Sequence, residues 1–298
     1  MDRTENTISH FFEGLGVSLG RLKLVESRHG AHRRIRLFRH PELGNVFVLG
    51  NEIQHVEAWA PLYHEPLVHL AAAFVPEVKD VLILGGGTLF AAAEALKYRS
   101  VRKVILVDHD PEVTKTVARY YRHAKQCLRD ERFQLLARDA YDGGGTAGSK
   151  FDLVLNDGID LLEVNHRQKS KHAMRDIFSE LRVSLAPEGV CADVIQRHLF
   201  ERHRIVRTIN RLGGRARVAL SLVLLPEYHG VLHVLSLWGR NTSLVSQHAT
   251  RPINKEQAGW MRNPARSPCA YYAPGFLPYY LYLPRYVREA LTPRKRAP

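Results

Sequence analysis

The stretch Val81–Asp110 decides the fold of this chain, and it reads VLILGGGTLFAAAEALKYRSVRKVILVDHD. The apolar run 81–84 predicts a buried strand, and Gly85–Gly87 predict a tight turn after it. The alanine-rich segment 89–98 predicts a helix, and a second apolar run ends at Asp108. A strand, a glycine turn, a helix and a strand in this order are typical of a parallel sheet that binds a ligand at the carboxyl ends of its strands.

Asp108 lies about 20 residues beyond the glycines, where a carboxylate can accept hydrogen bonds from both hydroxyls of a ribose. Glycines at the turn let a ligand approach the backbone and the N–H groups of the following helix. The unit therefore predicts a nucleoside-containing ligand. It departs from a dinucleotide fingerprint because Phe90 occupies the place of the last glycine. A glycine turn with no ligand is the alternative interpretation.

The overall composition sets the class of protein. The 298 residues suit one large domain or two smaller ones. The formal net charge of +13 favours an anionic partner over a merely solvated basic surface. Only three cysteines occur, without metal-ligand spacing, which favours a reducing, cytoplasmic location. No apolar run reaches the roughly 18 residues of a membrane span, so we expect no membrane contact.

The amino-terminal part, residues 1–60, is expected to form a small antiparallel β domain. A polar lead with an amphipathic turn at 8–15 comes first. Short alternating runs then predict strands at 22–26, 34–38, 45–49 and 52–56.

Residues 61–298 are expected to form an α/β domain with a doubly wound parallel sheet that helices cover on both faces. The predicted parallel strands are 81–84, 104–107, 133–136, 151–155 and 190–195, followed by an antiparallel pair at 219–225 and 231–238. Asp108, Asp139 and Asp157 each follow one of these strands. We therefore expect the three carboxylates to meet at one edge of the sheet.

Seven separated motifs resemble the spermidine synthase (polyamine aminopropyltransferase) family, in the family's order, over roughly residues 20–292. They are Gly44-Asn45-Val46 with Gln54, Tyr63-His64-Glu65, Gly85-Gly86-Gly87, Asp139-Ala140, Asp157-Gly158-Ile159-Asp160, Pro226 with Tyr228 and Gly230, and Tyr271-Tyr272 with Leu283-Pro284. The resemblance implies a methyltransferase-like, Rossmann-type fold and an adenosyl-sulfonium donor, S-adenosylmethionine or its decarboxylated form. It implies an enzyme in which a nucleophile attacks the side-chain carbon next to the sulfonium and methylthioadenosine leaves.

The resemblance also implies roles for individual residues. Asp157 orients and deprotonates the acceptor amine and holds the donor's ammonium, with Tyr63 and Asp160 in the same pocket; a turn cap is the alternative for Asp157. The residues expected to bind the donor are Gln54, His64, Gly85, Gly86, Gly87, Thr88, Asp108, Asp139, Ala140 and Arg33, and Tyr228 is expected on the acceptor side. The scattered histidines predict no metal site.

Three departures from the family pattern concern residues that the resemblance places near the amino end of the donor. Thr88 and Gly50 stand where the family has aspartates, and Arg33 stands where it has a glutamine. A guanidinium can bind a carboxylate with two parallel hydrogen bonds. Our hypothesis is therefore that intact S-adenosylmethionine donates a 3-amino-3-carboxypropyl group. The alternative is that Arg33 points to solvent.

The acceptor side departs as well, because the segment after Asp160 is basic. Its cationic candidates are His166, Arg167, Lys169, Lys171, His172 and Arg175, of which Arg167, Lys169 and Lys171 are expected to contact the acceptor. Such residues would repel a polyamine and attract phosphate. The predicted acceptor is anionic: a nucleotide phosphate, a peptidyl-nucleotide or, with less support, RNA. In this respect the chain is similar to the family branch that modifies microcin C-type peptide-nucleotide antibiotics. A solvated basic helix is the alternative.

Three other functions compete with this one. The first is an ordinary polyamine aminopropyltransferase (spermidine synthase), which would turn over putrescine with the decarboxylated donor. The second is a methyltransferase, which would release S-adenosylhomocysteine. The third is a nucleic-acid-binding protein without catalysis, which would bind RNA with strong salt dependence but no donor. The resemblance further implies a homodimer, although the sequence shows no interface motif.

Overall fold

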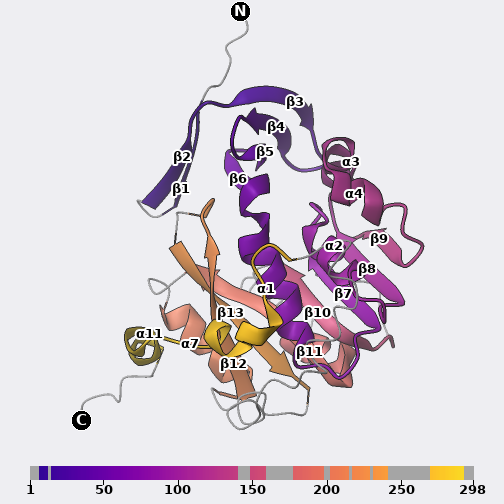
Figure 1. Ribbon diagram of the computed structural model, residues 1–298, viewed down its shortest axis with the longest axis vertical. Helices are drawn as coiled ribbons and strands as arrows, with labels where there is room; N and C mark the ends of the chain where they lie inside the picture. Colours follow the sequence, from indigo (N-terminus) through magenta and orange to yellow (C-terminus); the bar gives the residue numbers. More distant parts are fainter. Residues whose placement is uncertain are drawn as a thin grey trace, which may run out of the picture.

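A seven-stranded sheet forms the centre of the molecule in the computed structural model, and a smaller antiparallel sheet, formed by amino-terminal residues, lies above it in the view of Figure 1. The structure describes residues 7–12, 15–139, 148–158, 177–197, 202–214, 217–228, 231–240 and 269–291. All statements below concern these residues.

The central sheet has the order β12-β13-β11-β10-β7-β8-β9. Its strands are β7 (Asp80–Gly85), β8 (Lys103–Asp108), β9 (Phe133–Ala137), β10 (Phe151–Asp157), β11 (Leu185–Arg197), β12 (Val218–Leu225) and β13 (Val231–Gly239). The five strands from β11 to β9 are parallel, and β13 runs antiparallel to both β11 and β12. The order moves outward from β7 in both directions, so the carboxyl ends of β7, β8 and β10 lie side by side. The expected doubly wound α/β fold is confirmed.

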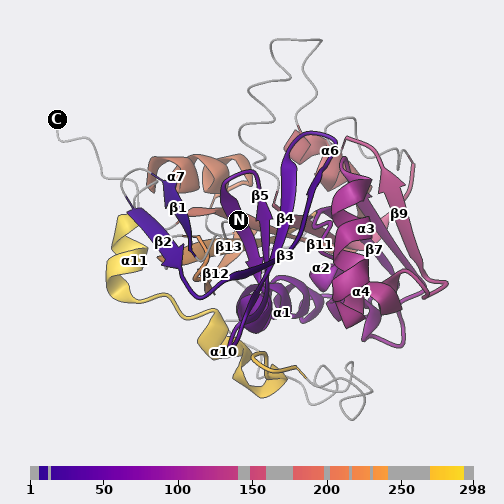
Figure 2. The same cartoon turned by 90° about the horizontal axis from the view of Figure 1, so that it is seen from above.

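Strand β7 shows why helices cover both faces of the sheet. Val81 and Ile83 pack into one hydrophobic cluster, and Leu82 and Leu84 pack into another, because side chains alternate along a strand. The first cluster includes residues of α1 (Ala60–Ala72), α2 (Phe90–Leu96), α3 (Pro111–Tyr120) and α4 (Arg122–Cys127), and the second includes residues of α6 (Ile177–Ser184), α7 (Arg202–Arg211) and α11 (Arg285–Ala290). Figure 2 shows α6 and α7 on the face opposite α1.

The amino-terminal sheet contains β3 (Lys23–His29), β4 (Arg34–His40), β5 (Gly44–Leu49) and β6 (Glu52–Val56), all antiparallel, as the alternating sequence predicts. The amphipathic turn predicted at 8–15 is wrong. Residues Ile8–Phe12 form strand β1, which pairs with β2 (Leu15–Leu19) in a hairpin. Ile8 is buried against the amino-terminal sheet and Ser9 is exposed, so the period is two and not the helical 3.6.

Other differences concern element lengths. Helix α4 was not predicted, because only six residues follow the break at Tyr121. In the arginine-rich segment after β11, helix α7 covers Arg202–Arg211 within the described part of the chain. The predicted strand 190–195 is longer, since β11 begins at Leu185. None of the described helices is both long enough and apolar enough to cross a membrane.

Helix α1 connects the two sheets and is buried along almost its whole length (Figure 1). The short helix η1 (Glu57–Trp59) leads into it, and Pro61 occupies its first turn, where a missing N–H has no helical partner to lose. Four polar residues of α1 are buried or nearly so: Tyr63, His64, Glu65 and His69. Each of these side chains has its own polar contact, and the contacts of Tyr63 and His64 belong to the candidate active site described below.

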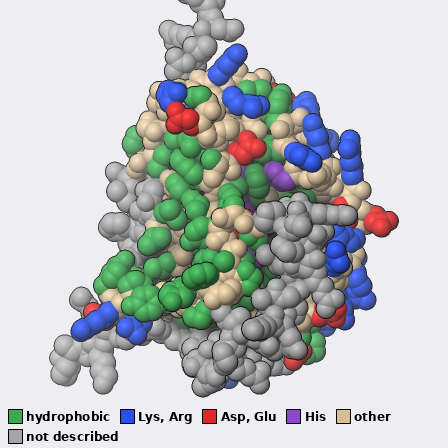
Figure 3. Space-filling model, viewed as in Figure 1, with side chains coloured by type: hydrophobic (Ala, Val, Ile, Leu, Met, Phe, Trp, Pro, Cys, Tyr) green, Lys and Arg blue, Asp and Glu red, His purple; other side chains and the backbone are tan. Residues whose placement is uncertain are grey.

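On the face of the molecule seen in Figure 3, basic and hydrophobic side chains gather in different regions. Exposed Lys and Arg side chains gather over α3 and α4, whereas hydrophobic side chains gather over the β1–β2 hairpin and the carboxyl-terminal segment with α10 (Leu277–Tyr280) and α11 (Figure 3). The basic residues are Lys115, Arg119, Arg122, Lys125 and Arg129. The exposed aromatic residues that the structure describes are Phe11 in the hairpin and Tyr271, Phe276, Tyr279, Tyr282 and Tyr286 in the carboxyl-terminal segment.

Candidate active site

The glycine turn after β7 closes against the end of β10. Gly85 and Gly86 both have φ of +74°, a region that residues with a Cβ rarely adopt. A Cβ atom on Gly86 would lie 2.4 Å from Asp157 Oδ2 and 3.0 Å from its Cγ. Only glycine therefore permits both this turn and the position of Asp157.

Asp157 ends strand β10, where its Cα lies opposite Gly85 of β7. The residue is 8% exposed, and its Oδ2 has no hydrogen-bond partner among the described residues. An ionised carboxylate in such a position strongly favours a cationic or hydrogen-bond-donating ligand, because burial removes water that would otherwise solvate it. The same environment makes a simple turn-capping role a poor account of Asp157.

Two side chains of α1 reach towards Asp157. Burial raises the pKa of Tyr63 well above its ordinary value, and the neighbouring Asp157 carboxylate raises it further, so the hydroxyl keeps its proton and can donate. His64 Nε2 lies 3.8 Å from Asp157 Oδ2.

The tautomer of His64 follows from its other ring nitrogen. Nδ1 lies 3.0 Å from the carbonyl oxygen of Ala60, which can only accept, so Nδ1 carries a proton. In the neutral ring Nε2 is then an acceptor that faces a second acceptor, Asp157 Oδ2. A donor placed between them, such as an ammonium group, would satisfy both.

Asp108 occupies the end of β8, as predicted, and is fixed from two sides. Its Oδ2 accepts from Gly87 N at 3.0 Å and its Oδ1 accepts from Asp110 N at 2.9 Å. Burial raises the pKa of Asp108, and these backbone hydrogen bonds offset part of that increase. Each carboxylate oxygen keeps a second acceptor position, which suits the expected contact with ribose hydroxyls.

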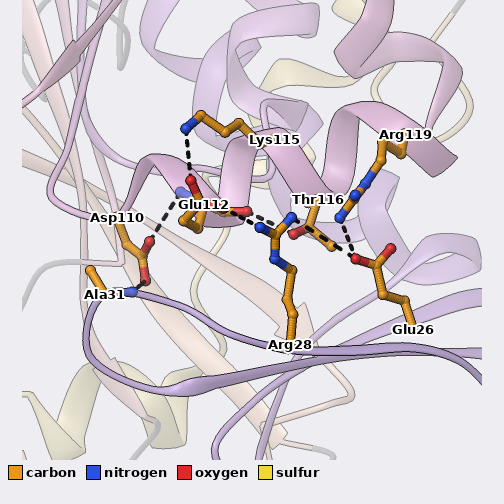
Figure 4. A network of polar contacts seen from close by, with 8 residues as sticks. All are labelled: Glu26, Arg28, Ala31, Asp110, Glu112, Lys115, Thr116 and Arg119. Atoms are coloured by element: carbon orange, nitrogen blue, oxygen red, sulfur yellow. Dashed lines mark hydrogen bonds and ion pairs between the residues drawn. The ribbon is translucent and has the colours of Figure 1, made fainter.

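The amino-terminal sheet is fastened to the main domain at Asp110 and helix α3, just after the end of β8 (Figure 4). Ala31 N, in the β3–β4 turn, donates to Asp110 Oδ2 at 3.0 Å. Arg28 pairs with Glu112 at 2.5 Å, and Arg119 of α3 pairs with Glu26 of β3. Because Asp110 also precedes α3 and caps it, this network holds the small sheet over the carboxyl ends of the strands.

A chain of polar contacts connects Tyr228 to Arg33. The hydroxyl of Tyr228 donates to Gln54 Oε1 at 3.0 Å, and Gln54 Nε2 donates to Glu52 Oε2 at 3.2 Å. Arg33 pairs with the same Glu52 oxygen at 2.8 Å, and its side chain is 55% exposed. The structure thus brings Gln54 and Tyr228 together and connects Arg33 to them through Glu52, which sequence reasoning missed.

Asp193 is a second missed carboxylate. It lies inside β11, is 3% exposed, and accepts from Asn156 Nδ2 at 2.6 Å across the parallel pair of β10 and β11. Its charge is one of the causes that raise the pKa of Tyr63. Two acids, Asp157 and Asp193, therefore lie around the Tyr63 hydroxyl.

The remaining predicted residues are only partly placed. Thr88 follows the glycine turn, and its carbonyl oxygen lies 2.9 Å from His123 Nε2. Asp139 follows β9 and is exposed. Asp160, Ala140, Arg167, Lys169 and Lys171 lie outside the described residues, as do His166, His172 and Arg175.

A cavity of about 400 Å³ lies on the other side of His64, between the start of α1, α2 and α4. Phe90 contributes to its wall and contacts the rings of His55, His64 and His123 at centroid distances of 4.1, 5.1 and 3.7 Å. Burial lowers the pKa of His55 well below its ordinary value and that of His123 to about 4. These two rings are therefore neutral near pH 7.

Comparison with known proteins agrees with this geometry. The model of the spermine/spermidine synthase domain matches residues 60–248. A polyamine aminopropyltransferase of Hamiltonella defensa is 27% identical over 273 residues, covering 90% of this chain and 89% of the relative. One of Yersinia pestis is 24% identical and covers 95% and 94%.

Two solved structures share the fold. The spermidine synthase of Thermotoga maritima superposes with a TM-score of 0.77 at 19% identity, covering 98% of this chain and 96% of that one. A spermidine synthase in complex with the transition-state analogue AdoDATO gives a TM-score of 0.78 at 19% identity. These likenesses confirm the expected methyltransferase-like fold with an amino-terminal β domain. The chain is an enzyme that belongs to the spermine/spermidine synthase family.

Proposed function

We propose that this enzyme transfers an aminopropyl group from decarboxylated S-adenosylmethionine to an amine of a polyamine, with release of methylthioadenosine. One observation carries the proposal: the buried Asp157 Oδ2 without a partner among the described residues, between His64 and the Gly86 turn. A carboxylate there can hold an ammonium group and later accept its proton.

The described residues suit an adenosyl donor. Gly86 leaves the space beside Asp157 that a Cβ would fill, Asp108 presents its carboxylate for the ribose, and Asp139 follows the next strand. The donor's sulfonium is itself a good leaving group, so the protein has to supply mainly position. The amine nitrogen attacks the methylene carbon next to sulfur, the C–S bond breaks, and sulfur keeps the electron pair as a neutral thioether. The new ammonium then gives up a proton, which the Asp157 carboxylate can accept.

The acidic surroundings of Asp157 support an amine as acceptor. Asp193 lies near the same Tyr63 hydroxyl, and Glu52 lies next to Gln54 and Tyr228. The exposed basic residues that the structure describes on α3 and α4 form a different surface (Figure 3).

The anionic acceptor and the carboxylated donor have less support. Arg33, on which the carboxylate hypothesis depends, already forms an ion pair with Glu52. The relatives named above are named as polyamine aminopropyltransferases or spermidine synthases. These points favour the polyamine acceptor over a peptidyl-nucleotide of the microcin C type.

A matrix of donors and acceptors tests the proposal. The purified chain is incubated with decarboxylated or intact S-adenosylmethionine and with putrescine, spermidine, adenosine monophosphate or no acceptor, and products are identified by mass spectrometry. We expect methylthioadenosine and an aminopropylated amine only with the decarboxylated donor and a polyamine. A carboxyaminopropyl product on the phosphate would overturn the proposal, and S-adenosylhomocysteine would indicate a methyltransferase.

A further inference from the structure

Three side chains that are far apart in the sequence converge on the side of α1 that faces α2 and the carboxyl-terminal segment. His69 Nε2 lies 2.9 Å from Glu94 Oε2 and 3.2 Å from Cys269 Sγ. All three atoms lie within 4.8 Å of one another. They come from α1, α2 and the start of the segment 269–291.

The His69 ring is held in one orientation. Its side chain is completely buried, its Nδ1 lies 2.8 Å from the Tyr98 hydroxyl, and Tyr272 stacks on it at a centroid distance of 5.2 Å. Without a metal, Nε2 can donate to the Glu94 carboxylate, while the Tyr98 hydroxyl donates to Nδ1. With a metal on Nε2, the Tyr98 oxygen can instead accept the Nδ1 proton. A hydrogen bond of this kind on the far nitrogen is the usual outer contact of a metal-bound histidine.

We propose that His69, Glu94 and Cys269 bind a zinc ion through Nε2, a carboxylate oxygen and Sγ, with water as the fourth ligand. Nitrogen, oxygen and sulfur donors together suit zinc better than the oxygen-seeking magnesium and calcium ions. Tetrahedral zinc with ordinary bond lengths holds its ligand atoms roughly 3.3 to 3.6 Å apart. The 3.2 Å between Nε2 and Sγ and the 2.9 Å between Nε2 and Glu94 Oε2 are slightly below this range, so these two pairs of atoms have to separate by a few tenths of an ångström.

Two features of the metal-free arrangement change when zinc binds. Burial raises the pKa of the Cys269 thiol to about 12, so it carries a proton, which zinc displaces as it binds the thiolate. Lys97 Nζ lies 2.5 Å from the same Glu94 oxygen and competes for it. Its side chain also lines the 400 Å³ cavity, which leaves room for the ammonium to turn away or to the other carboxylate oxygen.

The site would fasten the carboxyl-terminal segment to the main domain. Immediately after Cys269, the amides of Ala270, Tyr271 and Tyr272 donate to the Glu65 carboxylate at 2.7 Å each. Glu65 and His69 are four residues apart on α1, so the two anchors lie on one face of that helix. The zinc would add a second attachment between residues 65–69 of α1 and the start of the carboxyl-terminal segment.

The test uses the full chain, without an affinity tag, stripped of metal with a chelator. Calorimetry with zinc chloride and absorption spectra with cobalt(II) measure stoichiometry, affinity and ligand type. We expect one zinc per chain and a thiolate-to-cobalt charge-transfer band. Cys269→Ser should abolish the band and weaken zinc binding by roughly tenfold or more, whereas the control Cys191→Ser, at a buried free thiol of β11, should keep both.

Two further variants separate a metal site from a structural ion pair. Glu94→Gln should weaken zinc binding, and Lys97→Met should strengthen it, because the competing ammonium is removed. Zinc should raise the melting temperature of the wild type but not of Cys269→Ser, while the metal-free melting temperatures of the two are compared to exclude unfolding. Unchanged zinc affinity in Cys269→Ser, the absence of a thiolate band in the wild type, or loss of binding in Lys97→Met would each overturn the proposal.

Discussion

Gly86 and Asp157 fit together so closely that a single methyl group on Gly86 would lie 2.4 Å from the Asp157 carboxylate oxygen. Gly86→Ala should therefore displace the carboxylate and lower kcat/KM roughly 100-fold, since a displacement of about 1 Å at a reacting group has effects of this size. Steady-state kinetics with the decarboxylated donor and putrescine measures the change.

The matched control is Gly148→Ala. Gly148 also has a positive φ, +83°, but a Cβ there would meet nothing within 4 Å. Both variants carry the backbone strain of about 1 to 2 kcal/mol, whereas only Gly86→Ala has the collision. Equal activity of the two variants would show that the contact between Gly86 and Asp157 is irrelevant to the reaction.

The Glu65 carboxylate holds the carboxyl-terminal segment through three backbone amides. Glu65→Gln keeps the shape but leaves one acceptor oxygen and places an amide group against N–H donors. We expect the free energy of unfolding to fall by about 3 kcal/mol, with faster hydrogen exchange at residues 270–272. Glu77→Gln, at a side chain that is 57% exposed, is the control and should change neither quantity. If exchange at 270–272 stays slow in Glu65→Gln, the anchor lies elsewhere.

The buried histidines around Phe90 predict a loss of stability in acid. The native state keeps His123 neutral down to a pKa of about 4, whereas the unfolded chain binds the proton at the ordinary value of 6.5. The unfolded state therefore holds more protons between these values, and stability falls as pH falls through this window, by about 3 kcal/mol from His123. His55, whose pKa is also lowered by burial, acts in the same direction.

Denaturant unfolding on both sides of this window measures the effect. His123→Gln loses the contact with Thr88, so it is less stable at neutral pH, but its stability should depend less on pH. His203→Gln, at an exposed residue of α7, should leave the slope unchanged. If the free energy of unfolding depends on pH equally in His123→Gln and the wild type, His123 is not a source of the acid sensitivity.

Much of the fold could be predicted because strand ends and glycine turns have strong local signals. Asp108 and Asp157 were predicted correctly at the edge of the sheet, since parallel strands place their carboxyl ends together. Asp193 was missed because it lies inside a strand, and its contact with Asn156 arises only from the pairing of β10 with β11. Glu52 was missed for the same reason, in a strand of the amino-terminal sheet.

The three proposed zinc ligands show a second reason why prediction from the sequence was incomplete. Glu94 and Cys269 lie 25 and 200 residues from His69, so no spacing rule could associate them. The β1–β2 hairpin shows a third reason. A five-residue strand with one buried face has a sequence pattern like that of an amphipathic turn until its partner strand is known. In each case the structure depends on contacts between segments that the sequence alone does not bring together.

Arg33 offers a direct test of donor choice. Its guanidinium is paired with Glu52 and half exposed, so Arg33→Ala should change the affinity for decarboxylated S-adenosylmethionine by no more than a few-fold. Calorimetry with both forms of the donor should show tighter binding of the decarboxylated form in the wild type and in the variant. Tighter binding of the intact donor that disappears in Arg33→Ala would instead support carboxyaminopropyl transfer.

The central claim is that the Asp157 carboxylate, whose Oδ2 has no hydrogen-bond partner among the described residues, receives the ammonium groups in aminopropyl transfer. The most direct measurement is kcat/KM for putrescine, with the decarboxylated donor, in the wild type, Asp157→Asn and Asp152→Asn. Asp152 lies on the same strand and accepts from the amides of Lys79 and Asp80, away from the glycine turn. We predict a fall of roughly 100-fold or more in Asp157→Asn and little change in Asp152→Asn. Wild-type turnover in a folded Asp157→Asn would contradict the account.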